Sequence, residues 1–272
     1  MRDFEDTQEQ YPDRSPGIGL ALLLFLLLVV GQVLVATLLS SLEMAGARLD
    51  RTTTALLTTV LVYPPILWIG VRVAKRPWSE CYPLRPFRVS IVAPVPLVSV
   101  GAAILILEAL SWVPIPEAYS KVFHEALAGN RVSELLLVIL VGPVCEELFF
   151  RGWVLRSFLC RYSVRTSVLT SALLFAAGHV DPWYAMIVFP LGIFFAWLVL
   201  KTGSLVPSVV GHVTVNAISR VWPALLSFLG YDSEKIREAG HFPLAVLGVA
   251  LLLTVAGAAV LSRAVAEEGE TA

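Results

Sequence analysis

Six polar residues suited to acid–base chemistry lie between residues 146 and 216 of a chain that is otherwise rich in hydrocarbon side chains. Three of them end the stretch LLLVILVGPVCEELFFRG at residues 135–152, where two adjacent carboxylates and an arginine follow a long apolar run. A carboxylate can activate water, an imidazole can share or relay its proton, and amide groups can hold an oxyanion. The set therefore predicts a hydrolytic or proton-coupled site, and its members are Glu146, Glu147, Arg151, His179, His212 and Asn216.

Helical spacing sorts these residues by face. Glu147 and Arg151 stand at i and i+4 with the acid first, which is the favourable order for an ion pair within one helix. Glu146 is rotated by about 100° from Glu147 and has no cation of its own helix nearby. His212 and Asn216 are also four residues apart, so their side chains share a helix face and both can contact the same group.

Each residue taken alone also has a structural explanation. An i,i+4 pair such as Glu147–Arg151 is more often structural than catalytic, and Arg151 at a helix end can extend its charge towards the membrane interface. An intramembrane histidine is as often a packing hydrogen-bonder, and Asn216 alone is typical of a contact between helices. The concentration of two carboxylates, two imidazoles and an amide favours function, because ionisable groups in lipid are costly.

Composition defines the elements that must position these groups. The chain has 272 residues, 57% apolar and 15% charged, and its mean hydropathy is +0.78, whereas a soluble domain has about 25% charged residues. The apolar residues come in blocks of about 20, the length of a membrane-spanning helix. We therefore expect an all-α polytopic membrane protein with about eight transmembrane helices, at 17–40, 53–74, 89–112, 133–153, 166–181, 184–200, 204–225 and 242–262.

The chain is expected to form a single integral-membrane domain over residues 1–272, with a polar segment at 1–16 and a motif-bearing core at 133–225. The first apolar block is too long for a cleavable signal peptide, so it is interpreted as a retained span. The spacing of Cys81, Cys145 and Cys160 matches no metal or disulfide framework, and we expect all three to be reduced. The net charge of −1 gives no reason to expect a nucleic-acid partner.

Charge in the loops predicts the orientation. With Arg151 and Arg220 set aside as residues within spans, twelve Lys and Arg residues fall on the side of the two termini, counting Arg72 at the end of the second span, and six fall on the other side. Cytoplasmic loops carry the excess of positive charge, so both termini are expected in the cytoplasm. The short loops and the acidic tail favour a bacterial cytoplasmic (inner) membrane.

Two details concern depth and backbone. At about 1.5 Å per residue, the predicted span bounds place Glu146 and His179 at depths in the membrane that differ by about 10 Å. Tilted or offset helices, or an earlier start of the span at 133–153, would remove this difference. Pro143 has no N–H, so it frees a backbone carbonyl and can kink that span.

Three short motifs give the sequence a family resemblance. EELFFR at 146–151 fits EExxxR, FAAGH at 175–179 fits FxxxH, and HVTVN at 212–216 fits HxxxN. The run TGSLVPSVVGH at 202–212 also looks like the family's lead-in to the third motif. In order and spacing the chain resembles the CPBP family of CAAX prenyl proteases and bacteriocin-processing enzymes, which are glutamic intramembrane proteases.

The resemblance implies a role for each motif residue. Glu146 would be the general base that activates water, and His179 would share that water. His212 and Asn216 would polarise the scissile carbonyl and hold the oxyanion. Glu147 and Arg151 would support them. No cofactor is implied, and the substrate would be a membrane-anchored protein or peptide within the lipid bilayer.

Two alternatives stay open at this point. A zinc-dependent protease would use His179, His212 and Glu146 as ligands, since zinc binds imidazole and carboxylate, although the chain has no HExxH motif. A proton-coupled transporter or a non-proteolytic immunity protein could use the same polar cluster, although the chain lacks the internal repeat that many transporters show.

Overall fold

The computed structural model describes residues 16–47, 49–84, 89–114, 132–179, 181–232, 235–236 and 239–271, and each regular element within these ranges is a helix. The all-α prediction is therefore confirmed. Most of the predicted polar N-terminal segment, residues 1–15, lies outside the described residues.

The long helices follow the predicted spans closely. The span predicted at 133–153 is a composite helix in which α-helical and π-helical segments alternate, and we call α8 to α10 the motif helix. The elements are α2 (Ile18–Met44), α3 (Arg51–Ala74), α4 (Trp78–Cys81), α5 (Val89–Val92), α6 (Val95–Ser111), α8 (Val132–Leu135), η1 (Leu136–Val141), α9 (Gly142–Glu147), η2 (Leu148–Val154), α10 (Leu155–Leu159), α11 (Val164–Ala177), α12 (Pro182–Thr202), α13 (Val206–Phe228) and α15 (Leu244–Thr271).

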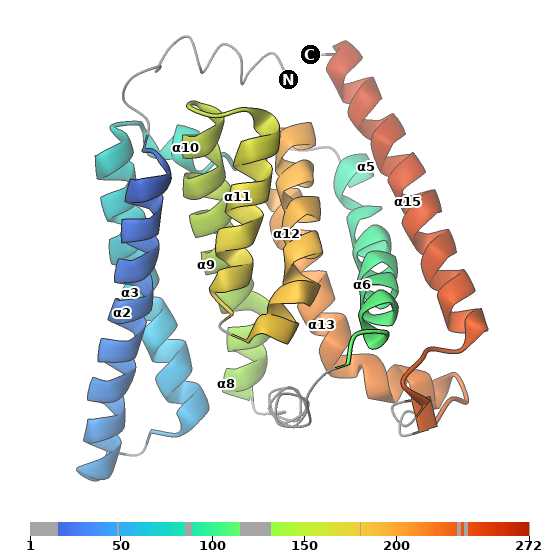
Figure 1. Ribbon diagram of the computed structural model, residues 1–272, viewed down its shortest axis with the longest axis horizontal. Coiled ribbons are helices and arrows are strands. Elements are labelled where there is room, and N and C mark those ends of the chain that lie inside the picture. The colour runs from blue at the N-terminus through green and yellow to red at the C-terminus, as the bar shows by residue number, and fades with distance from the viewer. Residues whose placement is uncertain are drawn as a thin grey trace.

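The helices stand side by side in a bundle (Figure 1). The α2–α3 pair lies at one side, α6 and α15 lie at the other, and the motif helix, α11, α12 and α13 lie between them. The start of α2 and the end of α15 lie at the same end of the bundle, at the top of Figure 1. This arrangement fits an even number of crossings, and the assignment of that end to the cytoplasm stays a prediction.

Five helical segments are long and apolar enough to cross a membrane: α2, α3, α5 with α6, α12 and α15. The remaining long columns are the motif helix, α11 and α13, which carry the polar motifs. Helix α11 is apolar but has only 14 residues, and the motif helix is divided into short α-helical and π-helical segments. The outward faces of α2 and α15 consist of hydrocarbon side chains, as at Leu34 (64% exposed) and Leu252 (65% exposed). Exposure of such a surface to water would be unfavourable. The chain is an integral membrane protein.

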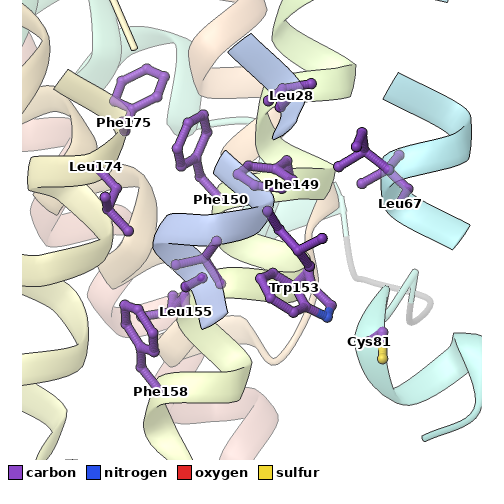
Figure 2. Close-up of a cluster of buried hydrophobic side chains, with 14 of the residues drawn as sticks. Leu28, Leu67, Cys81, Phe149, Phe150, Trp153, Leu155, Phe158, Leu174 and Phe175 are labelled. Atoms are coloured by element: carbon purple, nitrogen blue, oxygen red, sulfur yellow. The ribbon is translucent and has the colours of Figure 1, made fainter. Parts of the chain in front are cut away.

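The largest hydrophobic core fixes the motif helix against α2, α3 and α11. Figure 2 shows Phe149 and Trp153 facing Leu28 and Leu67, with Phe150 facing the α11 side. The Trp153 indole donates a 2.7 Å hydrogen bond to the Gly70 carbonyl of α3. A Cβ at Gly70 would lie 2.9 Å from that indole, so the close approach requires glycine.

Candidate active site

The backbone of the motif helix is widened on both sides of the two glutamates. In η1 the Gly142 N–H bonds to the Leu137 carbonyl, five residues back. The next donor in that register would be residue 143, which is a proline without an N–H. The Asn216 amide of α13 instead donates to the Val138 carbonyl at 2.8 Å. The freed carbonyl predicted from Pro143 is therefore satisfied from another helix, and π-helical turns of this kind are frequent at functional sites.

The second wide turn, η2, is held in a similar way. The Phe150 carbonyl accepts the Leu155 N–H five residues on. It also accepts the Ser171 hydroxyl of α11 at 2.9 Å. Side chains from α13 and α11 thus bind one carbonyl in each π-helical segment, and α9 with its two glutamates is held between these two points.

The expected difference of about 10 Å in depth between Glu146 and His179 is absent, and the reason is the position at which the motif helix ends. We predicted that this helix ends at residue 153, but α10 continues to Leu159. Counted from Leu159, Glu146 lies about 20 Å along the helix, and His179 lies about 22 Å from the start of α11 at Val164. The two residues are therefore at similar depth, because the motif helix ends later than predicted.

The predicted ion pair within the motif helix is confirmed. Arg151 Nη1 lies 3.1 Å from Glu147 Oε1, and both side chains are 0% exposed. Arg151 Nη2 also donates to the Gly192 carbonyl of α12 at 3.1 Å, and its guanidinium lies 4.2 Å from the centre of the Phe175 ring. A buried charge with so many partners can hold Glu147 in one position.

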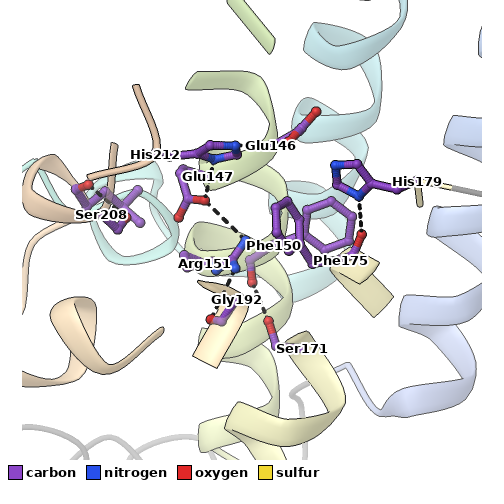
Figure 3. Close-up of polar contacts among 11 residues, drawn as sticks. Glu146, Glu147, Phe150, Arg151, Ser171, Phe175, His179, Gly192, Ser208 and His212 are labelled. Carbon is purple, nitrogen blue, oxygen red and sulfur yellow. Dashed lines mark hydrogen bonds and ion pairs between the residues drawn. The ribbon is translucent and has the colours of Figure 1, made fainter. Parts of the chain in front are cut away.

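The ion pair of Glu147 and Arg151 is not isolated, because a residue of another helix contacts it. His212 Nδ1 lies 3.0 Å from the same Glu147 oxygen, and its Nε2 lies 3.7 Å from Glu146 Oε2 (Figure 3). Because an ionised carboxylate only accepts hydrogen bonds, Nδ1 is the donor to Glu147, and Nε2 is the nitrogen on the Glu146 side. His212 thus connects the two glutamates from α13, a contact that helical phase within one segment could not reveal.

The two glutamates differ in access. The Glu146 side chain is 26% exposed, whereas that of Glu147 is 0% exposed. Glu146 lies within electrostatic reach of Arg151 on its own helix, but its ion-pair partner is the imidazole of His212 on α13. One carboxylate is thus fixed and buried while the other is accessible to a small reactant.

His179 reaches the same region from the end of α11. Its Nδ1 lies 3.0 Å from the Phe175 carbonyl, which can only accept, so Nδ1 is the donor, and in the neutral imidazole Nε2 carries the lone pair. Phe175 lies between the two imidazoles, with ring centres 5.0 Å from His179 and 5.6 Å from His212. In Figure 3 the second nitrogen of His179 lies on the side of Glu146. The motif residues of three helices therefore gather around Phe175.

Two tyrosines near Glu146 were not predicted. Tyr63 on α3 and Tyr184 on α12 both lie within electrostatic reach of Glu146, and the Tyr184 ring centre is 5.0 Å from that of His179. The first turn of α12 is capped by Asp181, which accepts the Tyr184 N–H at 2.9 Å. A phenol five residues after the motif histidine was a usable signal, but nothing local marks Tyr63.

The described residues contain no group of three or more His, Cys, Asp or Glu side chains close enough to hold a metal ion. The zinc alternative with His179, His212 and Glu146 stays a hypothesis for metal analysis. Cys81, Cys145 and Cys160 are all free thiols, as predicted.

Fold and site define an integral membrane protein with a buried carboxylate–imidazole cluster. The sequence model of the family described as type II CAAX prenyl endopeptidase Rce1-like matches residues 128–218, about a third of the chain, which include all three motifs. The resemblance to the CAAX protease family is thereby confirmed over this segment, and it supports intramembrane endopeptidase activity of the CAAX type in general. No curated protein and no solved structure matches the chain.

Proposed function

We propose that this protein is an intramembrane endopeptidase that hydrolyses a peptide bond of a membrane-anchored protein or peptide with a water activated by Glu146. The supporting observation is the position of His212, 3.0 Å from the buried Glu147 and 3.7 Å from the accessible Glu146. Two carboxylates in such different surroundings can take different roles, one as an orienting group and one as a base.

In the proposed reaction, Glu146 removes a proton from water while the water oxygen attacks the peptide carbonyl carbon. His179 holds the same water through Nε2, since its Nδ1–H is bound to the Phe175 carbonyl. Glu146 then returns the proton to the leaving nitrogen, the C–N bond breaks, and a carboxylate and an amine are released. The water supplies all added atoms, so no further reactant is needed.

The oxyanion formed on attack requires donors. His212 as an imidazolium would keep Nδ1–H on Glu147 and offer Nε2–H to the oxyanion. Asn216 uses one amide N–H for the Val138 carbonyl, and its second N–H is the other proposed donor. Arg151 and Glu147 would act by positioning His212 and would not touch the substrate.

The substrate proposed from the family name is a peptide anchored in the membrane near its C-terminal end, of which a prenylated CAAX tail is one form. The proposed location is a bacterial inner membrane with both termini in the cytoplasm. Neither proposal affects the chemistry at the site.

The test uses purified full-length protein in proteoliposomes with two anchored reporter peptides. One carries an S-farnesyl cysteine in a CAAX end and the other a single transmembrane helix with a mixed C-terminal tail, and mass spectrometry reads the products. We expect cleavage by the wild type and a loss of about 100- to 10 000-fold in Glu146→Gln, the usual contribution of a general base. Absence of any cleavage by folded wild type would reject the endopeptidase and leave the transporter and immunity hypotheses.

Metal analysis distinguishes the two hydrolytic mechanisms. A glutamic mechanism predicts full activity after dialysis against a strong chelator and less than one zinc per chain in the active protein. Stoichiometric zinc, with activity that is lost on chelation and restored by zinc, would establish the metalloprotease instead.

A further inference from the structure

Helix α12 carries none of the three motifs, yet two of its residues contact the candidate site. The Gly192 carbonyl accepts Arg151 Nη2 at 3.1 Å, and Phe195, three residues further on, lies with its ring against that of His212. Phe195 is 1% exposed, and it also lines a cavity of about 630 Å³ to which both imidazoles of the site contribute. The ring is therefore placed to act on the histidine or on a substrate in the cavity.

The contact between Phe195 and His212 has a defined geometry. The two ring centres lie 5.1 Å apart and the ring planes are inclined by 20°, which is an offset stack. Phe175 meets the same imidazole at 88°, with ring centres 5.6 Å apart. The residue before His212 is Gly211, and a Cβ there would lie 3.2 Å from Phe195 Cε1. The stack fixes the plane of the imidazole, while the contact of Nδ1 with Glu147 fixes its rotation within that plane.

The charges around His212 give this stack an electrostatic effect. The face of an aromatic ring is negative and attracts a cation within about 6 Å of its centre. His212 is a cation when both of its nitrogens carry hydrogen, the state in which both can donate. The carboxylates of Glu147 and Glu146, at 3.0 and 3.7 Å, favour the same state, whereas the nearby Arg151 guanidinium opposes it. The Arg151 guanidinium carbon lies 5.6 Å from the Phe195 ring centre, farther than the imidazole.

We propose that Phe195 is a positioning residue of this site: its ring face holds His212 as an imidazolium, in the plane from which Nε2 donates to the oxyanion. The proposal rests on the proposed endopeptidase function and adds a residue from outside the motifs to it. Phe195 acts through His212, and the oxyanion exists only after attack on the peptide carbonyl. The stack therefore stabilises the transition state more than the bound substrate, and its loss lowers kcat rather than raising KM.

The experiment measures kcat and KM for the anchored reporter in proteoliposomes with three variants. Phe195→Leu removes the ring, and a tri-fluorinated phenylalanine at position 195 keeps its shape but makes its face less negative. Phe194→Leu is the matched control on the same helix, since Phe194 packs against the same buried cluster as Phe195. We expect both changes at Phe195 to lower kcat about three- to thirty-fold, with KM within about twofold of wild type. Phe194→Leu should leave both constants within about twofold of wild type.

Two outcomes overturn the proposal while the endopeptidase stands. A raised KM at unchanged kcat in Phe195→Leu would show that the ring only contacts the substrate as part of the cavity wall. Wild-type kcat in the fluorinated variant would show that the ring does not stabilise a charge on His212. If Phe195→Leu fails to fold, the fluorinated variant decides, because it keeps the volume of the ring.

Unfolding in mild detergent gives a readout that does not depend on cleavage. Fluorination of Phe195 should change the unfolding equilibrium constant about three- to thirty-fold more in the wild-type background than in His212→Gln. Equal effects in the two backgrounds overturn the stack on a charged imidazole, even where cleavage is intact. If folded wild type cleaves no reporter, the endopeptidase is rejected and the catalytic role of Phe195 with it, whatever the unfolding cycle gives.

Discussion

The contact between Asn216 and the Val138 carbonyl leads to a prediction about the stability of the protein that can be tested separately from its catalytic activity. Pro143 cannot donate in the widened turn, so the amide at 2.8 Å replaces a missing backbone N–H. Asn216→Leu keeps a similar volume but leaves that carbonyl without its side-chain donor. An unsatisfied buried polar group costs about 1–3 kcal/mol, and lipid cannot supply a substitute donor. We therefore expect the free energy of unfolding to fall by about 1–3 kcal/mol.

A second substitution should remove this dependence. Pro143→Ala restores a backbone N–H, so the helix can satisfy the Val138 carbonyl from within, either in the widened register or by returning to an α-helical turn. In the Pro143→Ala background, Asn216→Leu should lower the free energy of unfolding by less than about 0.5 kcal/mol. The coupling free energy between the two positions is then about 1–2 kcal/mol. Activity is expected to stay low in both Asn216 variants, because the proposed oxyanion donor is lost in each.

The assay is equilibrium unfolding of the purified protein in a mild detergent, measured for the four members of the cycle. Thr214→Val serves as the matched control on α13, because the Thr214 hydroxyl bonds only to its own helix, at the Val210 carbonyl. It should change stability by less than about 0.5 kcal/mol in either background. If Asn216→Leu lowered the free energy of unfolding equally with and without Pro143, the Asn216 amide could not be the substitute for the N–H that proline lacks.

Three further predictions concern the support of the site. Gly192→Ala places a methyl 3.1 Å from Arg151 Nη2, so it should displace the guanidinium and lower kcat by about tenfold or more with little change in KM. Gly70→Ala places a methyl 2.9 Å from the Trp153 indole and should destabilise the protein by about 1–3 kcal/mol in detergent unfolding. Burial raises the pKa of the Cys81 thiol to about 11, so iodoacetamide should modify it at pH 8.5 far more slowly in the folded than in the unfolded protein.

Each of these has a control within the chain. Gly248→Ala meets no atom within 4 Å and should leave both activity and stability unchanged. For Cys81 the raised pKa also sets the sign of a pH effect. The contribution of the Cys81 thiol to the free energy of unfolding is complete below the free thiol's pKa of 9.0 and is lost as pH rises towards about 11. In Cys81→Ala this decrease of stability with pH should be absent. Equal alkylation rates in folded and unfolded protein would contradict the burial of the thiol.

Local patterns in the sequence were sufficient for the helices and for one ion pair. The blocks of apolar residues gave the spans, and the i,i+4 spacing gave Glu147–Arg151, because both depend on residues close together in the chain. Contacts between helices were not accessible in this way. The bond from His212 to Glu147 joins residues 65 apart, and no rule of helical phase relates α9 to α13. The late end of the motif helix at Leu159 was also missed, since the apolar block predicted a span that ends at residue 153.

The central claim is that Glu146 activates the water that cleaves the peptide bond, while Glu147 only orients His212. Single-turnover cleavage of the anchored reporter by Glu146→Gln and Glu147→Gln, each shown to be folded and free of wild type, tests this claim most directly. The account predicts a loss of about 100- to 10 000-fold in the Glu146 variant that no change of pH recovers, and a smaller loss in the Glu147 variant. Cleavage by Glu146→Gln within about tenfold of the wild-type rate would contradict it.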